Sequence, residues 1–211
     1  MLSNKKIYSK IKIYLTGYGP FHTFTENPAE IVVDTIFKNK EIIETENTKI
    51  LDKEIFEVKV DYVKEHLPLF FNKIDKDNND PTVLNIIVHY GLADPRLVIT
   101  IEKRAQNFVN DLIIKEKIDK DFPDEFIYSK LNIDSIIDIA NKDNVDCKPS
   151  EDAGTYLCNY ILFNSLRYYE KIDNVMATFI HIPLFTNCSL EHNLVFFKQF
   201  IKAVETIYLK D

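Results

Sequence analysis

Hydrophobic and polar positions along the chain follow two different periods, which together predict strands that alternate with helices. Apolar and polar side chains alternate over residues 11–16, a stretch rich in β-formers, and this predicts a strand. Residues 82–88 form a continuous apolar run, as expected of a central strand that is covered on both faces. Further strands are predicted over residues 97–101, 145–149 (an edge strand) and 175–180, and two short strand-like pieces flank Asp52-Lys53.

Apolar residues at helical spacing predict the helices between these strands. Asn27 and Pro28 match an N-cap followed by a proline in the first turn, so a helix should begin there and reach Phe37. Its inner face would carry Ile31, Val32, Thr35 and Ile36. The other helices are predicted over residues 61–74 (kinked at Pro68), 133–140, 150–169 and 190–208. Residues 17–21 are predicted as a turn, 40–48 as a loop, and 108–130 as a long excursion of the kind that often borders a site.

Strands that alternate with helices are typical of an α/β domain in which a mostly parallel sheet lies between helical layers. The chain has 211 residues, is 45% hydrophobic and shows neither an internal repeat nor a linker. We therefore expect residues 1–211 to form one domain, a three-layer α/β/α sandwich with a mostly parallel mixed sheet, preceded by a flexible N-terminal extension over residues 1–10.

Composition argues against several classes of partner. The net charge is −7 and no basic stripe occurs, which disfavours nucleic acid and anionic membranes as partners. No apolar run has the length of a membrane span or a signal peptide. The three cysteines, Cys147, Cys158 and Cys188, are too few for a disulfide scaffold, so we expect a cytoplasmic location.

Cys158 is the candidate nucleophile because the pattern places it in the early turns of a helix. Ser150 or Asp152 would cap this helix. The partial positive charge of a helix N-terminus favours a thiolate and should lower the pKa of the thiol. For a lone cysteine, however, a small buried residue on an apolar helix face is the simpler explanation, and other residues must overturn it.

A reactive cysteine needs a base, and that base needs a group that orients it. His181 is the best candidate base because it follows a predicted strand directly; His89 is the runner-up, and His22 is a weaker candidate. His66 and His192 are interpreted as surface or packing residues. The orienting group could be Glu102, at the end of another strand. In isolation, an exposed carboxylate paired with Lys103 or Arg104 explains Glu102 better.

Five segments of the chain favour the catalytic interpretation of Cys158 and Glu102 over the structural one. They are residues 16–21 (Thr-Gly-Tyr-Gly-Pro-Phe) with Asn27-Pro28, residues 88–93 (Val-His-Tyr-Gly-Leu-Ala), residues 99–102 (Ile-Thr-Ile-Glu) with Ala105 and Asn107, residues 150–159 (Ser-Glu-Asp-Ala-Gly-Thr-Tyr-Leu-Cys-Asn), and residues 179–183 (Phe-Ile-His-Ile-Pro). In sequence, order and spacing they resemble the pyroglutamyl-peptidase I (pyrrolidone-carboxylate peptidase) family of cysteine exopeptidases. The resemblance covers nearly the whole chain, and all four glycines fall within it.

This resemblance implies a phosphorylase/hydrolase-like fold, a role for each motif, and no metal or cofactor. Cys158 would be the nucleophile, His181 the general base and acid, and Glu102 the group that orients the imidazole. The reaction would remove N-terminal pyroglutamate from small peptides through a thioester acyl-enzyme. Family members occur as monomers and as homo-oligomers such as tetramers, and we expect one of these states.

The resemblance also implies a substrate pocket that includes Tyr18, Phe21, Asn27 and Leu92. Tyr18 and Phe21 match positions where aromatic side chains sandwich the lactam ring. A pyroglutamyl ring has no ammonium group, so an apolar slot accepts it without burying a charge. Asn27 matches a position near this pocket. Leu92 stands where some members carry glutamine, and since leucine has no polar side-chain group, recognition at this position would have to occur through the backbone.

The chain departs from the family pattern at several positions. His22-Thr23 stand where glycine is usual, Tyr18 replaces a phenylalanine, and Lys103 replaces an arginine. The altered first turn is the only sequence support for the alternative function, a weak or inactive homologue that acts as a binding or scaffold protein. A nucleoside-phosphorylase-like enzyme is disfavoured because no phosphate-cradling glycine loop occurs.

Overall fold

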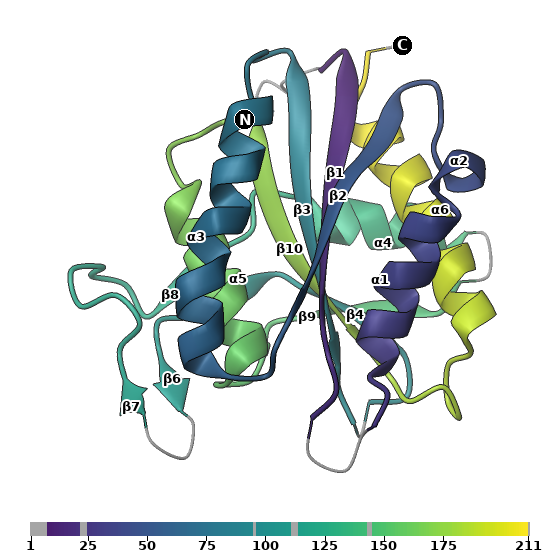
Figure 1. The fold of residues 1–211 in the computed structure, drawn as a ribbon. Coiled ribbons are helices and arrows are strands. Elements are labelled where there is room, and N and C mark those ends of the chain that lie inside the picture. The colour runs from purple at the N-terminus through teal and green to yellow at the C-terminus, as the bar shows by residue number, and fades with distance from the viewer. Residues whose placement is uncertain (1–7, 22–24, 95, 111–113, 143–144, 211) are drawn as a thin grey trace.

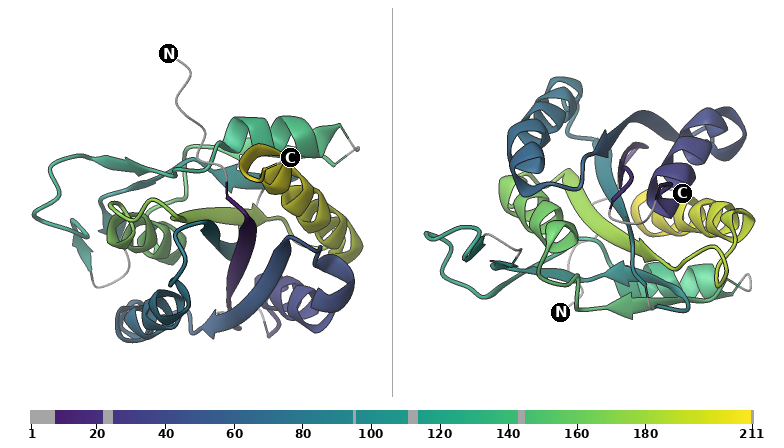
Figure 2. Two further views of the ribbon diagram at one scale, coloured as in Figure 1. Left: turned by 90° about the horizontal axis from the view of Figure 1, so that it is seen from above. Right: turned by 60° about the horizontal axis from the view of Figure 1, so that its bottom comes forward.

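A computed structural model of the chain describes residues 8–21, 25–94, 96–110, 114–142 and 145–210. Within them, six strands form one sheet in the order β2-β1-β3-β10-β4-β9, and helices cover both faces (Figures 1 and 2). The strands are β1 (Lys10–Tyr18), β2 (Thr48–Phe56), β3 (Val83–Leu92), β4 (Ile99–Glu102), β9 (Cys147–Ser150) and β10 (Val175–Ile182). The only antiparallel pair among them joins β10 and β4, so the predicted mostly parallel, mixed sheet is confirmed.

The helices form one layer on each side of this sheet (Figure 1). Helices α3 (Val60–Asp77) and α5 (Leu157–Tyr168) cover one face. Helices α1 (Pro28–Lys38), α4 (Ile133–Asn141) and α6 (Leu190–Tyr208) cover the other. Alternate residues of β1, β3 and β10 therefore feed two separate apolar cores, and the three-layer sandwich is confirmed. None of the described helices is long and apolar enough to cross a membrane.

Helix α1 begins as the sequence predicts. The Asn27 side chain accepts a hydrogen bond from the Ala29 amide at 3.0 Å, and it also donates to the Gly19 carbonyl at 3.0 Å. Of the predicted inner face, Val32 and Ile36 are buried. Ile31 and Thr35 are only half-buried, because the buried stripe passes instead through Ala29 and Val33.

Three strands are longer than predicted, because pairing with a neighbouring strand continues the ladder. Gly17, Gly91 and His181 consequently lie inside strands rather than in the turns that follow them. The two predicted strand pieces around Asp52 form the single strand β2, in which Leu51 is an extra residue opposite β1.

Two predicted loops contain regular structure. Residues 40–48 include the short helix α2 (Lys40–Ile43). The excursion over residues 108–130 contributes to two small antiparallel sheets. These pair β5 (Arg104–Gln106) with β8 (Phe126–Tyr128), and β6 (Val109–Asn110) with β7 (Lys115–Glu116). Helix α3 continues through Pro68.

Part of the predicted N-terminal extension is built into the fold. Residues 1–7 lie outside the described residues. Tyr8 is buried, and its amide donates to the Tyr208 carbonyl at 2.8 Å. Lys10 begins β1. These two residues are therefore held by the sheet and by the end of α6.

We predict that Asn27→Ala lowers the free energy of unfolding by about 1 kcal/mol, because the first turn of α1 loses its cap. Urea unfolding measures this change. Asn39→Ala, which removes an exposed side-chain bond at the other end of α1, is the matched control and should cost less. Equal losses of unfolding free energy in the two variants would show that the Asn27 cap stabilises the protein no more than an exposed side-chain bond does.

Candidate active site

The side chains of His181 and Glu102 meet at the edge where β1, β3 and β10 end. His181 Nδ1 lies 2.8 Å from Glu102 Oε1. The residues come from the antiparallel pair β10 and β4, in which His181 is opposite Thr100. Both side chains are buried, and His181 Nε2 has no hydrogen-bond partner among the described residues. A carboxylate that holds one ring nitrogen leaves the other free to accept a proton.

Glu102 is not the exposed carboxylate that the simpler interpretation required. Its side chain has no exposed surface. Lys103 instead pairs with Asp134 at 2.8 Å, and Arg104 pairs with Glu151. That interpretation is wrong because Glu102 faces the core side of a short strand that is flanked by two others.

Arg96 is a member of this site that the sequence analysis missed. Its guanidinium donates to Glu102 Oε1 at 2.7 Å and also contacts the Thr100 hydroxyl. A second guanidinium nitrogen donates to the Asp152 carbonyl at 2.6 Å, in the loop before α5. Arg96 therefore ties the carboxylate to the chain that leads to the cysteine. The sequence feature that could have indicated Arg96 is its position between the motifs at residues 88–93 and 99–102.

Cys158 lies on α5 above the same strand ends. Gly91 is paired in register with His181 on the neighbouring strand. A Cβ atom on Gly91 would lie 3.0 Å from the Cys158 Sγ and 2.6 Å from the ring of Phe179. The thiol thus occupies the space that a side chain at position 91 would need, one strand away from the imidazole. The structure thus joins His181 to Glu102 and places Cys158 over the strand next to His181.

The cysteine helix begins later than predicted. Its first residue is Leu157, so Cys158 is the second, and the side chain of Tyr156 at the N-cap position makes no capping hydrogen bond. Ser150 cannot cap it because it ends β9, paired with Glu102. Asp152 instead accepts from the Gly154 amide at 2.9 Å, in a turn where Gly154 has φ of 78°, a conformation that favours glycine.

The pKa of the Cys158 thiol is raised to about 12, which contradicts the predicted lowering. Burial is the main cause and the charge of Glu102 adds to it, while Arg96 and the Cys158 backbone oppose it. Burial also lowers the pKa of His181, although Glu102 acts in the opposite direction. Burial would raise the pKa of Glu102 as well, but bonds with His181 and Ser150 and the charge of Arg96 bring it below its usual value. Both pKa shifts favour the uncharged forms at neutral pH, a thiol for Cys158 and an imidazole for His181.

The hydrogen bonds of the other histidines that the structure describes, His66, His89 and His192, join them to residues other than Glu102. His89, the runner-up base, has no exposed surface, and its two ring nitrogens bond to the hydroxyls of Thr16 and Ser165. It is not at a strand end, because β3 continues past it. His66 stacks on Tyr62 and His192 lies in the first turn of α6, while His22 falls outside the described residues.

The long excursion after β5 borders the site, as the sequence predicts. Asn159, next to the cysteine, is buried and holds this segment through its side chain. Its amide accepts from the Gln106 backbone at 2.7 Å and donates to the carbonyls of Gln106 and Phe108 at 2.8 and 2.9 Å.

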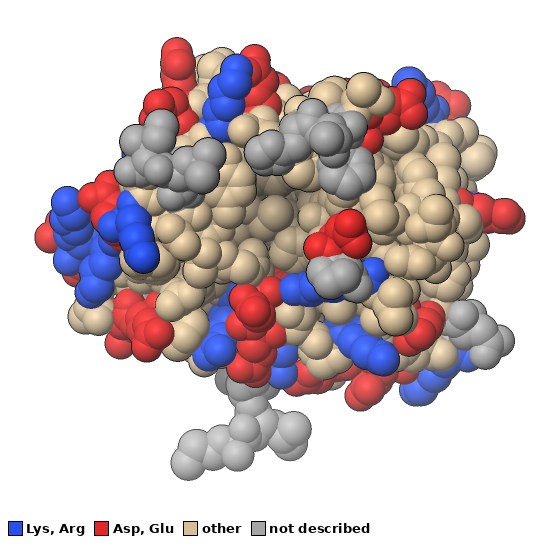
Figure 3. Space-filling view, turned by 90° about the horizontal axis from the view of Figure 1, so that it is seen from below, with Lys and Arg blue, Asp and Glu red and all other residues tan. Residues whose placement is uncertain are grey.

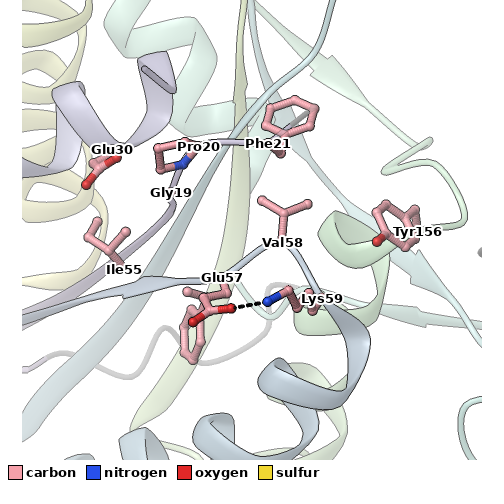
Figure 4. A pocket seen from close by; sticks show the side chains of 10 residues that line it. Gly19, Pro20, Phe21, Glu30, Ile55, Glu57, Val58, Lys59 and Tyr156 are labelled. Atoms are coloured by element: carbon pink, nitrogen blue, oxygen red, sulfur yellow. Dashed lines mark hydrogen bonds and ion pairs between the residues drawn. The ribbon is translucent and has the colours of Figure 1, made fainter. Parts of the chain in front are cut away.

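A pocket of about 510 Å³ opens beside the start of α5. Its lining combines Phe21, Ile55, Val58 and Tyr156 with the charged Glu30, Glu57 and Lys59 (Figure 4). Figure 3 shows the face at which the parallel strands end, where uncharged side chains make up much of the surface around a hollow and some acidic and basic ones lie close to it. The sequence did not predict Tyr156 and Val58 as pocket residues, because the expected aromatic residues lie in the segment 17–21.

Only Phe21 among the four expected substrate residues lines this pocket. Tyr18 is buried, and its hydroxyl donates to the Leu157 carbonyl at 2.9 Å. Asn27 lies behind Gly19, with both side-chain groups bonded to the backbone, and Leu92 is the half-buried last residue of β3. Among the described residues, no group of three or more His, Cys, Asp or Glu side chains could hold a metal ion.

Comparison with known proteins agrees with this geometry. A family model described as pyroglutamyl peptidase matches residues 11–195. A pyrrolidone-carboxylate peptidase of Oceanobacillus iheyensis is 30% identical over 198 residues, which cover 89% of this chain and 92% of that protein. Another, from Brachyspira hyodysenteriae, is 29% identical and covers 93% of this chain and 96% of its own.

Solved structures show the same fold. A pyrrolidone carboxyl peptidase from Pyrococcus furiosus matches with a TM-score of 0.78 at 25% identity, covering 93% of this chain and 99% of its own. The pyrrolidone carboxyl peptidase from Thermococcus litoralis matches with a TM-score of 0.76 at 23% identity, covering 91% of this chain and 92% of its own. The family model spans most of the chain, so the chain belongs to the pyroglutamyl peptidase family, as its motifs predicted.

Proposed function

We propose that Cys158, His181 and Glu102 carry the reaction of this family, the hydrolytic removal of N-terminal pyroglutamate from peptides. The observation that carries the proposal is the 2.8 Å contact between His181 Nδ1 and Glu102, with the Cys158 thiol beside the strand that adjoins His181. A thiol, a base and a group that orients the base are the parts that acyl transfer to cysteine requires.

The first half of the reaction breaks the peptide bond. Glu102 accepts a hydrogen bond from the Nδ1–H group of His181, so Nε2 is the basic nitrogen. Because thiol and imidazole are both neutral at rest, Nε2 takes the thiol proton as the sulfur attacks the carbonyl carbon of pyroglutamate. The tetrahedral adduct collapses when the C–N bond breaks and His181 returns that proton to the leaving amine. A thioester between Cys158 and pyroglutamate remains.

The second half regenerates the enzyme. A water molecule gives a proton to His181 Nε2 and attacks the thioester carbonyl. The C–S bond then breaks, the sulfur regains the proton from His181, and pyroglutamate leaves. In both halves the negative oxygen needs donors. The backbone N–H of Cys158 can serve, because amides in the first turn of a helix have no partner within the helix.

The pocket supports recognition of an uncharged ring. Phe21, Val58 and Tyr156 present apolar surface close to the cysteine helix, and Tyr156 precedes Cys158 by two residues. A lactam has no ammonium group to desolvate, so burial against such side chains is favourable. Within this proposal Phe21 contacts the ring, Asn27 fixes the turn that carries it, and Leu92 contributes through its backbone.

The sequence departures leave the three proposed catalytic residues intact. The His22-Thr23 change lies outside the described residues, and Lys103 points to Asp134 rather than to the site. No comparison supports the binding or scaffold alternative. A cytoplasmic location, the oligomeric state, and the single domain over residues 1–211 stay predictions.

The first test measures release of aminomethylcoumarin from pyroglutamyl-aminomethylcoumarin under reducing conditions. We expect the wild type to hydrolyse it and Cys158→Ala to lower kcat/KM at least about a thousandfold, because the nucleophile is lost. Cys188→Ala and Cys147→Ala are matched controls, since both thiols are buried elsewhere, and both should retain activity. A folded wild type without hydrolysis would refute the proposal.

A second prediction concerns the space above Gly91. Gly91→Ala should lower kcat about a hundredfold or more, because its Cβ would displace Cys158 or Phe179. Measurement of kcat and of urea unfolding separates this effect from a loss of folding. Adding Phe179→Leu relieves the ring contact but not the thiol contact, so activity should stay low. Recovery in the double variant would show that the thiol position does not depend on Gly91.

A third prediction concerns pH. Because the pKa of His181 is lowered, the base stays deprotonated below pH 6.5, and the acid limb of kcat/KM should lie below that value. Glu102 raises the pKa of His181, so Glu102→Gln should move this limb to still lower pH and reduce kcat at least about a hundredfold. An acid limb that stays in place in Glu102→Gln would show that Glu102 does not act through His181.

A further inference from the structure

Tyr18 carries a hydroxyl group that does not serve the pocket. Its ring is 4% exposed and packs in the core beneath α3 and α5. The hydroxyl donates to the carbonyl oxygen of Leu157 at 2.9 Å, within the buried interior. Burial raises the pKa of Tyr18 well above its usual value, and the nearness of Cys158 adds to this effect. The hydroxyl that sets this chain apart from the family pattern therefore reaches the peptide beside the nucleophile.

The bond to Leu157 controls more than one atom. The Leu157 carbonyl and the Cys158 N–H belong to the same planar peptide group, so a bond that fixes one end fixes the direction of the other. A carbonyl that accepts a hydrogen bond also polarises its own N–H, which becomes a stronger donor. Tyr18 is thus connected, through one peptide unit, to the N–H that we propose as an oxyanion donor.

A second polar contact holds the same helix two turns further on. Thr16, on the same face of β1 as Tyr18, bonds to His89 Nδ1 at 2.7 Å. His89 Nε2 in turn bonds to Ser165 on α5 at 2.8 Å. All three side chains are at most 1% exposed. Ser165 lies seven residues after Cys158, so both project from the same face of the helix.

His89 is well suited to a fixed contact of this kind. Burial lowers its pKa to about 3, so the ring is neutral at neutral pH. A neutral imidazole offers one donor and one acceptor, and the hydroxyls of Thr16 and Ser165 can each adopt the complementary role. The contact therefore holds β1, β3 and α5 together without a charge that would need desolvation.

We propose that Tyr18 and His89 are positioning residues, which hold the segment Leu157–Ser165 of α5 at both ends and thereby set the Cys158 thiol and N–H above Gly91. The two contacts bracket the nucleophile along the helix, and the absent side chain of Gly91 leaves room for the thiol between them. The effect on catalysis rests on the proposed function of Cys158, whereas the effect on the helix does not.

Tyr18→Phe tests the first contact, because it keeps the ring and removes only the hydroxyl. We expect kcat for pyroglutamyl-aminomethylcoumarin to fall about tenfold while KM stays within about twofold, since a donor is weakened rather than lost. A pyroglutamyl aldehyde, which forms a tetrahedral adduct with the thiol, should bind about tenfold more weakly. Free pyroglutamate, which forms no adduct, should bind as before. An unchanged kcat, or a change confined to KM, would overturn the proposal.

Tyr14→Phe is the matched control. Tyr14 lies on the same strand and the same face as Tyr18, but its hydroxyl bonds to Asp77 and Asn85 at 3.4 Å, away from α5. This variant should leave kcat within about twofold of the wild type. A loss of kcat equal to that of Tyr18→Phe would mean that any buried hydroxyl on this face matters equally.

Ser165→Ala tests the second contact, and a readout without catalysis keeps the result independent of the proposed function. Hydrogen exchange of the amides over residues 157–165 should speed up in Ser165→Ala and in Tyr18→Phe, but not in Tyr14→Phe. The double variant of Tyr18 and Ser165 should lose more kcat than the product of the single losses, because neither end is then held. Unchanged exchange in both single variants would refute the positioning role even if the wild type proved inactive.

Discussion

The buried carboxylate of Glu102 is the constraint on which the site depends. A charge without exposed surface is costly to desolvate unless it is paired and hydrogen-bonded. Here the compensation comes from His181 and Arg96, which both contact the same oxygen, Oε1. Arg96 also binds the Asp152 carbonyl, so the need of one carboxylate for partners fixes the loop before the cysteine helix as well. The base, its orienting group and the entry to α5 are parts of one electrostatic arrangement.

The direction of one strand explains why this carboxylate is buried. Strand β4 runs antiparallel to β10, so Thr100 is opposite His181 and Glu102 is opposite Phe179, two residues further into the sheet. The histidine can stay near the edge while its partner lies deeper. On the other side of β10, Gly91 is in register with His181 and leaves room for the sulfur. The reversal of the sheet at β4, whose direction β9 shares, and the absent side chain of Gly91 thus create a site in an otherwise closely packed face.

The sequence predicted the layers and most elements, because periodicity reports burial directly. It ranked His181 above His89 but could not exclude His89, since both follow apolar runs and the contact of His89 with α5 is a tertiary one. It also placed the start of α5 too early, because capping residues such as Ser150 and Asp152 serve a strand and a turn equally well. Arg96 was missed because its partners are set by tertiary contacts, and the raised pKa of the thiol depends on burial that a single helix cannot reveal.

The neutral resting state makes position more important than charge in this site. If thiol and imidazole formed an ion pair at rest, their attraction would help to hold them together. With both groups neutral, the proton moves only as the sulfur attacks, so the helix that carries Cys158 must already be in place. This gives a physical meaning to the departures from the family pattern. Lys103 bonds to Asp134 outside the site and leaves it unaffected, whereas the extra hydroxyl of Tyr18 bonds to the peptide that carries the nucleophile.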